Sequence, residues 1–122
     1  MKPTFTAGKN IAMKVPSHEF KKTVEFYGDV LGLPEADVAD KGTSQVFEFG
    51  GKNLWVDKID GISQAEIWLE IETDDIDAAS GYLAEKGCIR RDEIEPLPNG
   101  YKGFWVSSPS NIIHLMTEKQ KL

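Results

Sequence analysis

Cysteine and histidine, the residues that most often hold structural metals in proteins, are scarce in this sequence. Cys88 is the single cysteine among 122 residues, and there are 2 histidines. A disulfide framework and a thiolate metal site within one chain are therefore excluded. Because Cys88 directly follows Gly87, which we expect to end a helix, we expect its thiol to be buried and unreactive.

Basic residues are outnumbered by acidic ones, and long apolar runs are missing. Lys and Arg total 14 against 20 Asp and Glu, which gives a formal net charge of −6. Nucleic-acid binding is not expected, because contacts with phosphates require a basic surface. No apolar stretch approaches a membrane-spanning length and the first residues carry no apolar leader, so we expect a cytoplasmic protein without a membrane partner. The negative charge is compatible with a cationic or neutral ligand.

Common catalytic signatures are also missing. The sequence has no glycine-rich phosphate loop, and it shows no spacing of nucleophile, base and orienting residue that sequence alone could defend. One metal-free alternative stays open, in which His114 acts as a general base together with Asp57 or a glutamate.

What the sequence does contain is an internal repeat. Residues 10–15 alternate between apolar and polar side chains, as expected for a strand, and lead into a helix pattern that stops at Gly32. Residues 66–72 alternate in the same way and lead into a second helix pattern that stops at Gly87. Each half of the chain therefore begins with a strand and a helix.

The residues around these helices complete the expected fold. Ser17 is the expected N-cap of the first helix, and Asp74 or Asp75 that of the second. Further strands are expected over residues 35–39, 45–49 and 54–57 in the first half and 89–94, 104–106 and 112–116 in the second. The order predicts one α+β domain over residues 1–122 with two tandem βαβββ modules, about residues 8–60 and 62–120. We expect a curled mixed sheet around a cleft, with the helices on its outer face.

One helix per module can cover only one face of the strands in that module. The apolar face of each module's first strand must meet the helix, so the residues that alternate with it are left on the opposite face. A concave face of that kind is typical of small-ligand sites. The residues that this alternation places there are Asn10, Lys14, Trp55, Trp68, Glu70 and Trp105.

Three segments carry a resemblance to a known family. The first segment consists of Ile11-Ala12-Met13-Lys14-Val15-Pro16, followed by Phe26-Tyr27 and Leu31-Gly32-Leu33. The second consists of residues 72–79 with Lys86-Gly87, and the third of residues 108–115. They resemble the two module openings and the closing turn and strand of the vicinal oxygen chelate superfamily, which contains glyoxalases, extradiol dioxygenases, epimerases and bleomycin-resistance proteins. The resemblance covers nearly the whole chain and implies the fold more strongly than any one function, since this scaffold hosts many chemistries.

In the enzymes of that superfamily four side chains, typically His or Glu, hold a divalent metal, so the resemblance implies four positions here. They fall on Asn10, Trp55, Trp68 and His114, where the match of His114 assumes a one-residue deletion in the preceding turn. Tryptophan cannot ligate a divalent ion, and asparagine is a poor ligand for transition metals. Asp57 and His114 remain as metal candidates, too few for tight binding. We therefore expect neither the family's metal site nor another cofactor.

These observations favour a small-molecule-binding protein, closest to the non-metal bleomycin-resistance-like members and acting as a homodimer. An aromatic face with carboxylates between the rings suits a flat or cationic ligand, since a cation over a tryptophan ring gains about 0.5–2 kcal/mol. The expected ligand-binding residues are Asn10, Trp55, Asp57, Trp68, Glu70, Trp105 and His114.

Other interpretations stay open at this point. One is a metal-dependent lyase, isomerase or dioxygenase with an altered ligand set, and another is a module that binds a partner through a tryptophan-rich face. The tryptophans equally fit a core or a dimer seam. The glutamates of residues 66–72 fit a solvated strand face, and His114 fits a hydrogen-bonded structural histidine.

Overall fold

The computed structural model of the chain describes residues 2–38 and 41–120. It has an α+β fold in which each half follows the predicted order of strand, helix and further strands. The chain divides into two compact units. We call Lys9–Trp68 the first unit, and the residues before Lys9 together with those after Trp68 the second unit.

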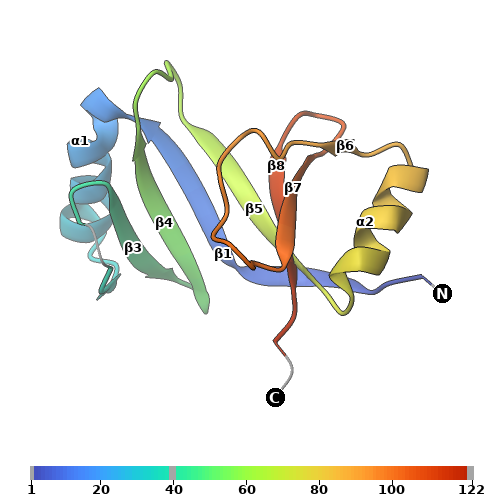
Figure 1. Cartoon of the computed structure of the whole chain (residues 1–122). Coiled ribbons are helices and arrows are strands. Elements are labelled where there is room, and N and C mark those ends of the chain that lie inside the picture. Colours follow the sequence, from blue (N-terminus) through green and yellow to red (C-terminus); the bar gives the residue numbers. More distant parts are fainter. Residues whose placement is uncertain (1, 39–40, 121–122) are drawn as a thin grey trace. The chain divides into compact units, whose positions relative to one another are not determined.

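In the first unit the strands run in the order β2-β3-β4-β1, and the helical segment lies along one of their faces (Figure 1). Strand β1 pairs in parallel with β4, while β3 pairs antiparallel with both β2 and β4. Gly50 and Gly51, at φ 59° and 82°, form the tight turn between β3 and β4. The elements are β1 (Phe5–Pro16), η1 (Ser17–Glu19), α1 (Phe20–Glu25), η2 (Phe26–Val30), β2 (Glu35–Ala36), β3 (Ser44–Phe49) and β4 (Lys52–Ile59).

The core of the first unit lies between its strands and its helical segment. Its buried residues are Val15, Phe47, Leu54 and Val56, which the pairing of β1, β3 and β4 places on one face. Partly buried residues of β1, of the helical segment and of the loop after it pack against them, namely Ile11, Met13, Phe20, Val24, Tyr27 and Leu33. The alternation of residues 10–15 therefore predicted the buried face of β1 correctly.

The start of this helical segment differs from the prediction. Ser17 makes no N-cap hydrogen bond, because it is already inside the 3₁₀ turn η1, whose N-cap position is Pro16. Its hydroxyl instead donates to the Ile59 carbonyl oxygen at 3.3 Å and to the Asp60 carboxylate. Ser17 thus joins the end of β1 to the end of β4 rather than capping a helix.

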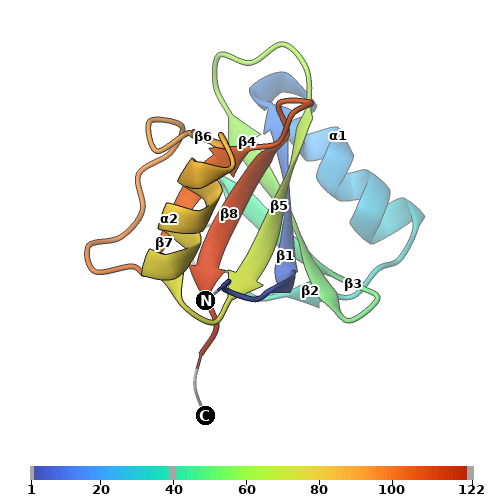
Figure 2. The same cartoon turned by 90° about the vertical axis from the view of Figure 1, so that its right-hand side faces the viewer.

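In the second unit the strands run in the order β5-β8-β7-β6, and α2 covers one face of them (Figure 2). Strand β5 pairs in parallel with β8, and the remaining neighbours are antiparallel. Asp75 caps α2 as predicted, since its side chain accepts a hydrogen bond from the Ala78 N–H at 3.0 Å. The elements are β5 (Glu66–Thr73), α2 (Ile76–Glu85), β6 (Ile89–Arg90), β7 (Gly103–Ser107) and β8 (Ile113–Glu118).

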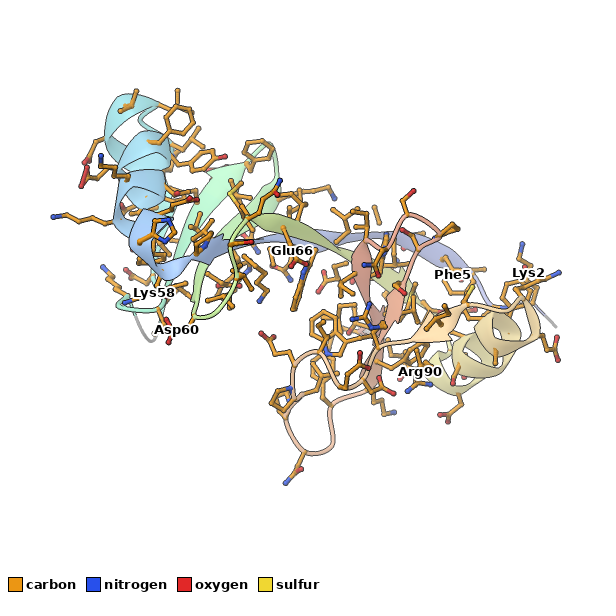
Figure 3. All side chains as sticks on the ribbon, turned by 90° about the horizontal axis from the view of Figure 1, so that it is seen from above. Lys2, Phe5, Lys58, Asp60, Glu66 and Arg90 are labelled. Carbon is orange, nitrogen blue, oxygen red and sulfur yellow. The ribbon has the colours of Figure 1, made fainter. Side chains whose placement is uncertain are left out.

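The core of the second unit lies under α2. Ala79 of the helix packs there against Phe104, Val106 and Met116 of the strands, and Ile71, Ile76 and Leu83 surround this cluster. The N-terminal segment joins the unit, as Lys2 and Phe5 lie along α2 (Figure 3). Their contact there is Tyr82, whose ring centroid is 6.0 Å from that of Phe5 and 5.4 Å from the Lys2 Nζ.

Two further observations bear on the sequence predictions. Cys88 is exposed, so the prediction of a buried thiol is wrong; it lies beyond the last turn of α2 and not in the core. Within the described residues, no helix has both the length and the apolar character needed to cross a membrane.

Candidate functional site

The pairing of β1 with β4 brings polar side chains together on the face of the first unit that its helices leave uncovered. Asn10 lies opposite Asn53, Ala12 opposite Trp55, and Lys14 opposite Asp57. These residues alternate with the buried core residues of both strands, so they point to the other side. We call this set, together with Ser44 of β3, the polar face of the first unit.

Asn10 and Trp55 are joined directly. The Asn10 Oδ1 accepts a hydrogen bond from the Trp55 indole Nε1 at 2.9 Å and another from the Asn53 Nδ2 at 3.1 Å. An amide oxygen has two lone pairs, so both are engaged by protein donors. Two positions that the family resemblance assigns to metal ligands are thus linked by a hydrogen bond between the Trp55 N–H and the Asn10 amide oxygen.

A buried ion pair lies beside them. The Lys14 Nζ is 2.8 Å from the Asp57 Oδ2, and only 7% of the lysine side chain and 15% of the aspartate side chain are exposed. The Ser44 hydroxyl donates to the other Asp57 oxygen, Oδ1, at 2.6 Å. A desolvated charge is tolerated only when it is paired and hydrogen-bonded, and both oxygens of Asp57 are engaged in this way.

The same lysine occupies the face of Trp68. Its Nζ lies 4.4 Å from the centroid of the Trp68 ring, within the range of a cation–π interaction. Trp68 is 8% exposed, and its indole N–H donates to the Glu66 Oε1 at 3.2 Å. The first unit therefore supplies its own cation to Trp68, whereas Trp55 remains partly exposed.

In the second unit, the face opposite α2 carries a row of three residues in register across the strands. Trp105 of β7 lies opposite Leu115 of β8, which in turn lies opposite Glu70 of β5. We call these three residues the Trp105 row. Trp105 is 5% exposed, and its indole Nε1 donates to the Glu95 carbonyl oxygen at 2.9 Å. Glu70 lies against Gly8, where an added Cβ would be 2.8 Å from its carboxylate carbon.

His114 does not lie on that face, and the sequence prediction that it shares a face with Glu70 and Trp105 is wrong. The structure pairs His114 with Leu69 and with Val106, and Val106 belongs to the core under α2. The His114 Nδ1 is 2.9 Å from the Ile112 carbonyl oxygen, so this nitrogen is the donor.

His114 lies on the other face because the two copies of the repeat differ by one residue in the register of their last strand. Strand β4 sets Leu54 beside Ile11, and β8 sets His114 in the corresponding place beside Leu69. The residue equivalent to Trp55 is therefore Leu115. A shift of one residue moves every side chain of a strand to the other face. The register of β8 is set by the turn before it. The Ser108 N–H donates to the Ile112 carbonyl oxygen at 2.9 Å, and this hairpin fixes the pairing between β7 and β8.

The family's divalent metal does not fit this donor set. Asn10 has its amide oxygen engaged, Trp55 and Trp68 cannot ligate, and His114 lies on the helix-covered face. Asp57 is committed to Lys14 and Ser44. Across residues 2–38 and 41–120, no group of three or more His, Cys, Asp or Glu side chains is placed to hold a metal ion.

Asp74 and Glu93 each have a carboxyl group with a lowered pKa, and neither belongs to the polar face of the first unit or to the Trp105 row. The Thr4 backbone N–H, which donates to the Asp74 Oδ1 at 2.9 Å, holds the pKa of Asp74 below its ordinary value. The Arg91 guanidinium does the same for the pKa of Glu93 through a hydrogen bond at 2.7 Å. Neither perturbation marks a catalytic group, because each carboxylate is paired and lies at the surface.

Solved structures with the same fold cover almost the whole of this chain. The Mn(II)-bound glyoxalase from Novosphingobium aromaticivorans matches with a TM-score of 0.69 and 18% identity, over 98% of this chain and 43% of that one. Homoprotocatechuate 2,3-dioxygenase from Brevibacterium fuscum matches with a TM-score of 0.65 and 21% identity, over 98% of this chain and 34% of that one. The same enzyme from Arthrobacter globiformis matches with a TM-score of 0.64 and 22% identity, over 98% of this chain and 38% of that one. No protein-family model and no curated protein sequence matches the chain.

These matches define the class of fold. The chain has the fold of the vicinal oxygen chelate superfamily, to which glyoxalases and extradiol dioxygenases belong, as the resemblance in the sequence implied. It spans less than half the length of the solved proteins that it matches. At identities of 18–22% the likeness extends to the fold and not to an activity.

Proposed function

We propose that this chain is a small-molecule-binding domain of the glyoxalase and bleomycin-resistance type that works without the metal of the family's enzymes. The observation that carries the proposal is the hydrogen bond between the Trp55 indole and Asn10, at two positions that the resemblance assigns to metal ligands. Because this bond pairs the Trp55 N–H with the Asn10 amide oxygen, neither group depends on a metal for a partner. The solved glyoxalase, by contrast, is Mn(II)-bound.

The ligand that we propose is flat and neutral or cationic, and it stacks on the partly exposed ring of Trp55. A net charge of −6 favours the approach of cations over anions. Trp68 is a poorer platform than the sequence predicted, because Lys14 already lies over its ring. Trp105 is buried as well, at 5% exposure. Burial of both rings also argues against a partner-binding module that uses a tryptophan-rich face.

Titration of the tryptophan fluorescence tests this proposal. The planar cation acriflavine is expected to quench saturably, and the planar anion 2-naphthalenesulfonate is expected not to. Trp55→Ala is expected to weaken acriflavine binding about tenfold, since stacking on one aromatic ring contributes about 0.5–1.5 kcal/mol beyond the area that it buries. Trp55→Phe keeps a ring and is expected to bind nearly as well, and Lys21→Ala on exposed α1 serves as the control. Equal binding by wild type and Trp55→Ala would refute the assignment.

We also propose that the chain acts as a homodimer. Phe26, Val30 and Leu31 lie at the end of the first helical segment with exposures of 47%, 71% and 52%. Apolar side chains clustered in this way at the surface are typical of contact sites between proteins. Light scattering coupled to size-exclusion chromatography is expected to give twice the monomer mass. A monomer at all concentrations would rule the dimer out.

A further inference from the structure

The polar face of the first unit extends across β3, where strand pairing arranges its side chains in three rows. Strands β1, β4 and β3 lie side by side (Figure 1), and residues directly opposite each other point to the same side of the sheet. The rows are Lys14 with Asp57 and Ser44, Ala12 with Trp55 and Val46, and Asn10 with Asn53 and Glu48. We call the third the Glu48 row. Glu48 therefore shares this face with Trp55, one row away.

The ring of Trp55 is directed toward the Glu48 row. Its indole Nε1 donates to the Asn10 Oδ1 at 2.9 Å, and Asn10 belongs to that row. On the neighbouring strand, Glu48 lies two residues after Val46, which is directly opposite Trp55. Residues at such diagonal positions are about 7–8 Å apart, within reach of aromatic and long side chains. A ligand that stacks on Trp55 can therefore reach Glu48 with a short arm.

Glu48 differs from Asp57 because its charge is not used inside the protein. Its side chain is exposed, and in the described part of the chain its carboxylate makes neither a hydrogen bond nor an ion pair. Asn53 beside it donates through Nδ2 to the Asn10 Oδ1 at 3.1 Å, and no described residue donates to its own Oδ1. A carboxylate and an amide oxygen are both acceptors. This end of the row therefore offers two acceptors, one of them charged, to a ligand that donates.

A cavity of about 330 Å³ lies at this end of the row. It is lined by Glu48 and Asn53, by residues 34–36 and by residues 51–52. Its charged side chains are Glu35, Glu48 and Lys52, so two carboxylates face one ammonium group. The Glu48 N–H donates to the Pro34 carbonyl oxygen at 2.9 Å, which holds β3 against the segment before β2. The volume is at the lower end of the range for ligand pockets, about 300–1,000 Å³, and suits one polar arm of a ligand.

We propose that this cavity is a cation subsite of the Trp55 site. Glu48 pairs with an ammonium group of the ligand, the Asn53 Oδ1 accepts from the same group, and the flat part of the ligand stacks on Trp55. The inference rests on the proposed small-molecule binding and narrows the ligand to an aromatic ring that carries an ammonium group on a short aliphatic arm. Stacking on Trp55 accepts any flat ring, so Glu48 is the residue that selects for positive charge.

Three compounds with one ring system and different charges test the subsite. They are 2-naphthylmethylamine, an ammonium ion at pH 7, the neutral 2-naphthalenemethanol and the anion 2-naphthalenesulfonate. Titrations are followed by the ¹H–¹⁵N NMR signal of the Trp55 indole N–H, which is assigned by its loss in Trp55→Phe. Wild type is expected to bind the ammonium compound most tightly. Glu48→Gln is expected to weaken that binding about two- to fivefold, the effect of losing one exposed ion pair, and to leave the binding of the alcohol unchanged.

Glu25→Gln is the matched control, because it makes the same change in net charge on the exposed part of α1, which lies on the other face of the strands. It is expected to leave both affinities unchanged. Equal affinity of wild type and Glu48→Gln for the ammonium compound would overturn the subsite, and so would equal losses in Glu48→Gln and Glu25→Gln. In either case a saturable shift of the Trp55 signal would leave the proposed stacking standing. No shift with any of the three compounds would refute the stacking, and the subsite with it.

Discussion

The buried lysine of the first unit shows how single residues set the chemistry of its polar face. Lys14 is neutralised by Asp57 at 2.8 Å and stacked over Trp68 at 4.4 Å, so its charge is fully engaged inside the protein. The result is a face whose charges are paired internally. Asp57 therefore offers no free carboxylate to the ligand that we propose, whose contact is the partly exposed ring of Trp55.

Removing one partner of this pair is expected to be costly. Asp57→Asn leaves Lys14 buried without a counter-charge, and we expect it to lower the free energy of unfolding by about 3 kcal/mol. Lys14→Met with Asp57→Asn removes both charges and is expected to recover a large part of that loss. Urea unfolding of the wild type, both single variants and the double variant measures the coupling. Additive losses would mean that the ion pair contributes nothing of its own.

At the scale of the elements, the glycines differ in whether their surroundings leave room for a side chain. At Gly103 of β7, an added Cβ would lie 2.7 Å from the Met116 carbonyl oxygen and against the ring of Tyr101. At Gly81 of α2, nothing lies within 4 Å. The first glycine is required by the close pairing of β7 with β8, and the second is not required by any contact.

Alanine at these two positions is expected to have opposite effects. Gly103→Ala forces backbone to move and should destabilise the protein by about 1–3 kcal/mol. Gly81→Ala should stabilise it by up to about 1 kcal/mol, because alanine is the better helix former. Thermal unfolding of the two variants side by side checks the contrast, and a neutral Gly103→Ala would contradict the pairing of β7 with β8.

The N-terminal segment is tied to the start of α2 by Asp74, and this tie is expected to depend on pH. The Thr4 N–H lowers the pKa of Asp74 in the folded protein. A lowered pKa contributes stability above the unfolded value, about 3.9, and this contribution is lost as the pH falls through the folded value. Hydrogen exchange at Thr4 should therefore accelerate relative to Phe5 below about pH 4 in the wild type. Asp74→Asn should remove that pH dependence.

At the scale of the whole molecule, the fold of a metalloenzyme superfamily is combined with a donor set that does not suit a metal. The expected consequence is that stability does not respond to divalent ions, because only a species that binds the folded state raises its unfolding temperature. Mn(II), Zn(II) and EDTA should leave the melting temperature unchanged. Elemental analysis of protein purified without chelator is the second readout. Stoichiometric metal in that protein would reverse the conclusion.

Agreement between sequence and structure is best where the signal is local. Alternation of residues 10–15 placed Asn10 on the face opposite the core of the first unit, and Asp75 was recognised as a cap from its position before α2. The errors at Ser17 and His114 each involve a partner that is distant in the sequence, and the error at Cys88 concerns its burial. Ser17 binds the end of β4, Cys88 lies outside the core, and His114 is turned by the register of β8.

The sequence by itself determined the α+β fold and the repeat, because these depend on residue types and short-range periodicity. Only the tertiary structure decided which side chains meet on the polar face of the first unit. The bond from Trp55 to Asn10 and the ion pair between Lys14 and Asp57 join residues whose distance is set by the pairing of β1 with β4. Strand register is fixed by contacts across the sheet, and a difference of one residue reverses which side chains meet.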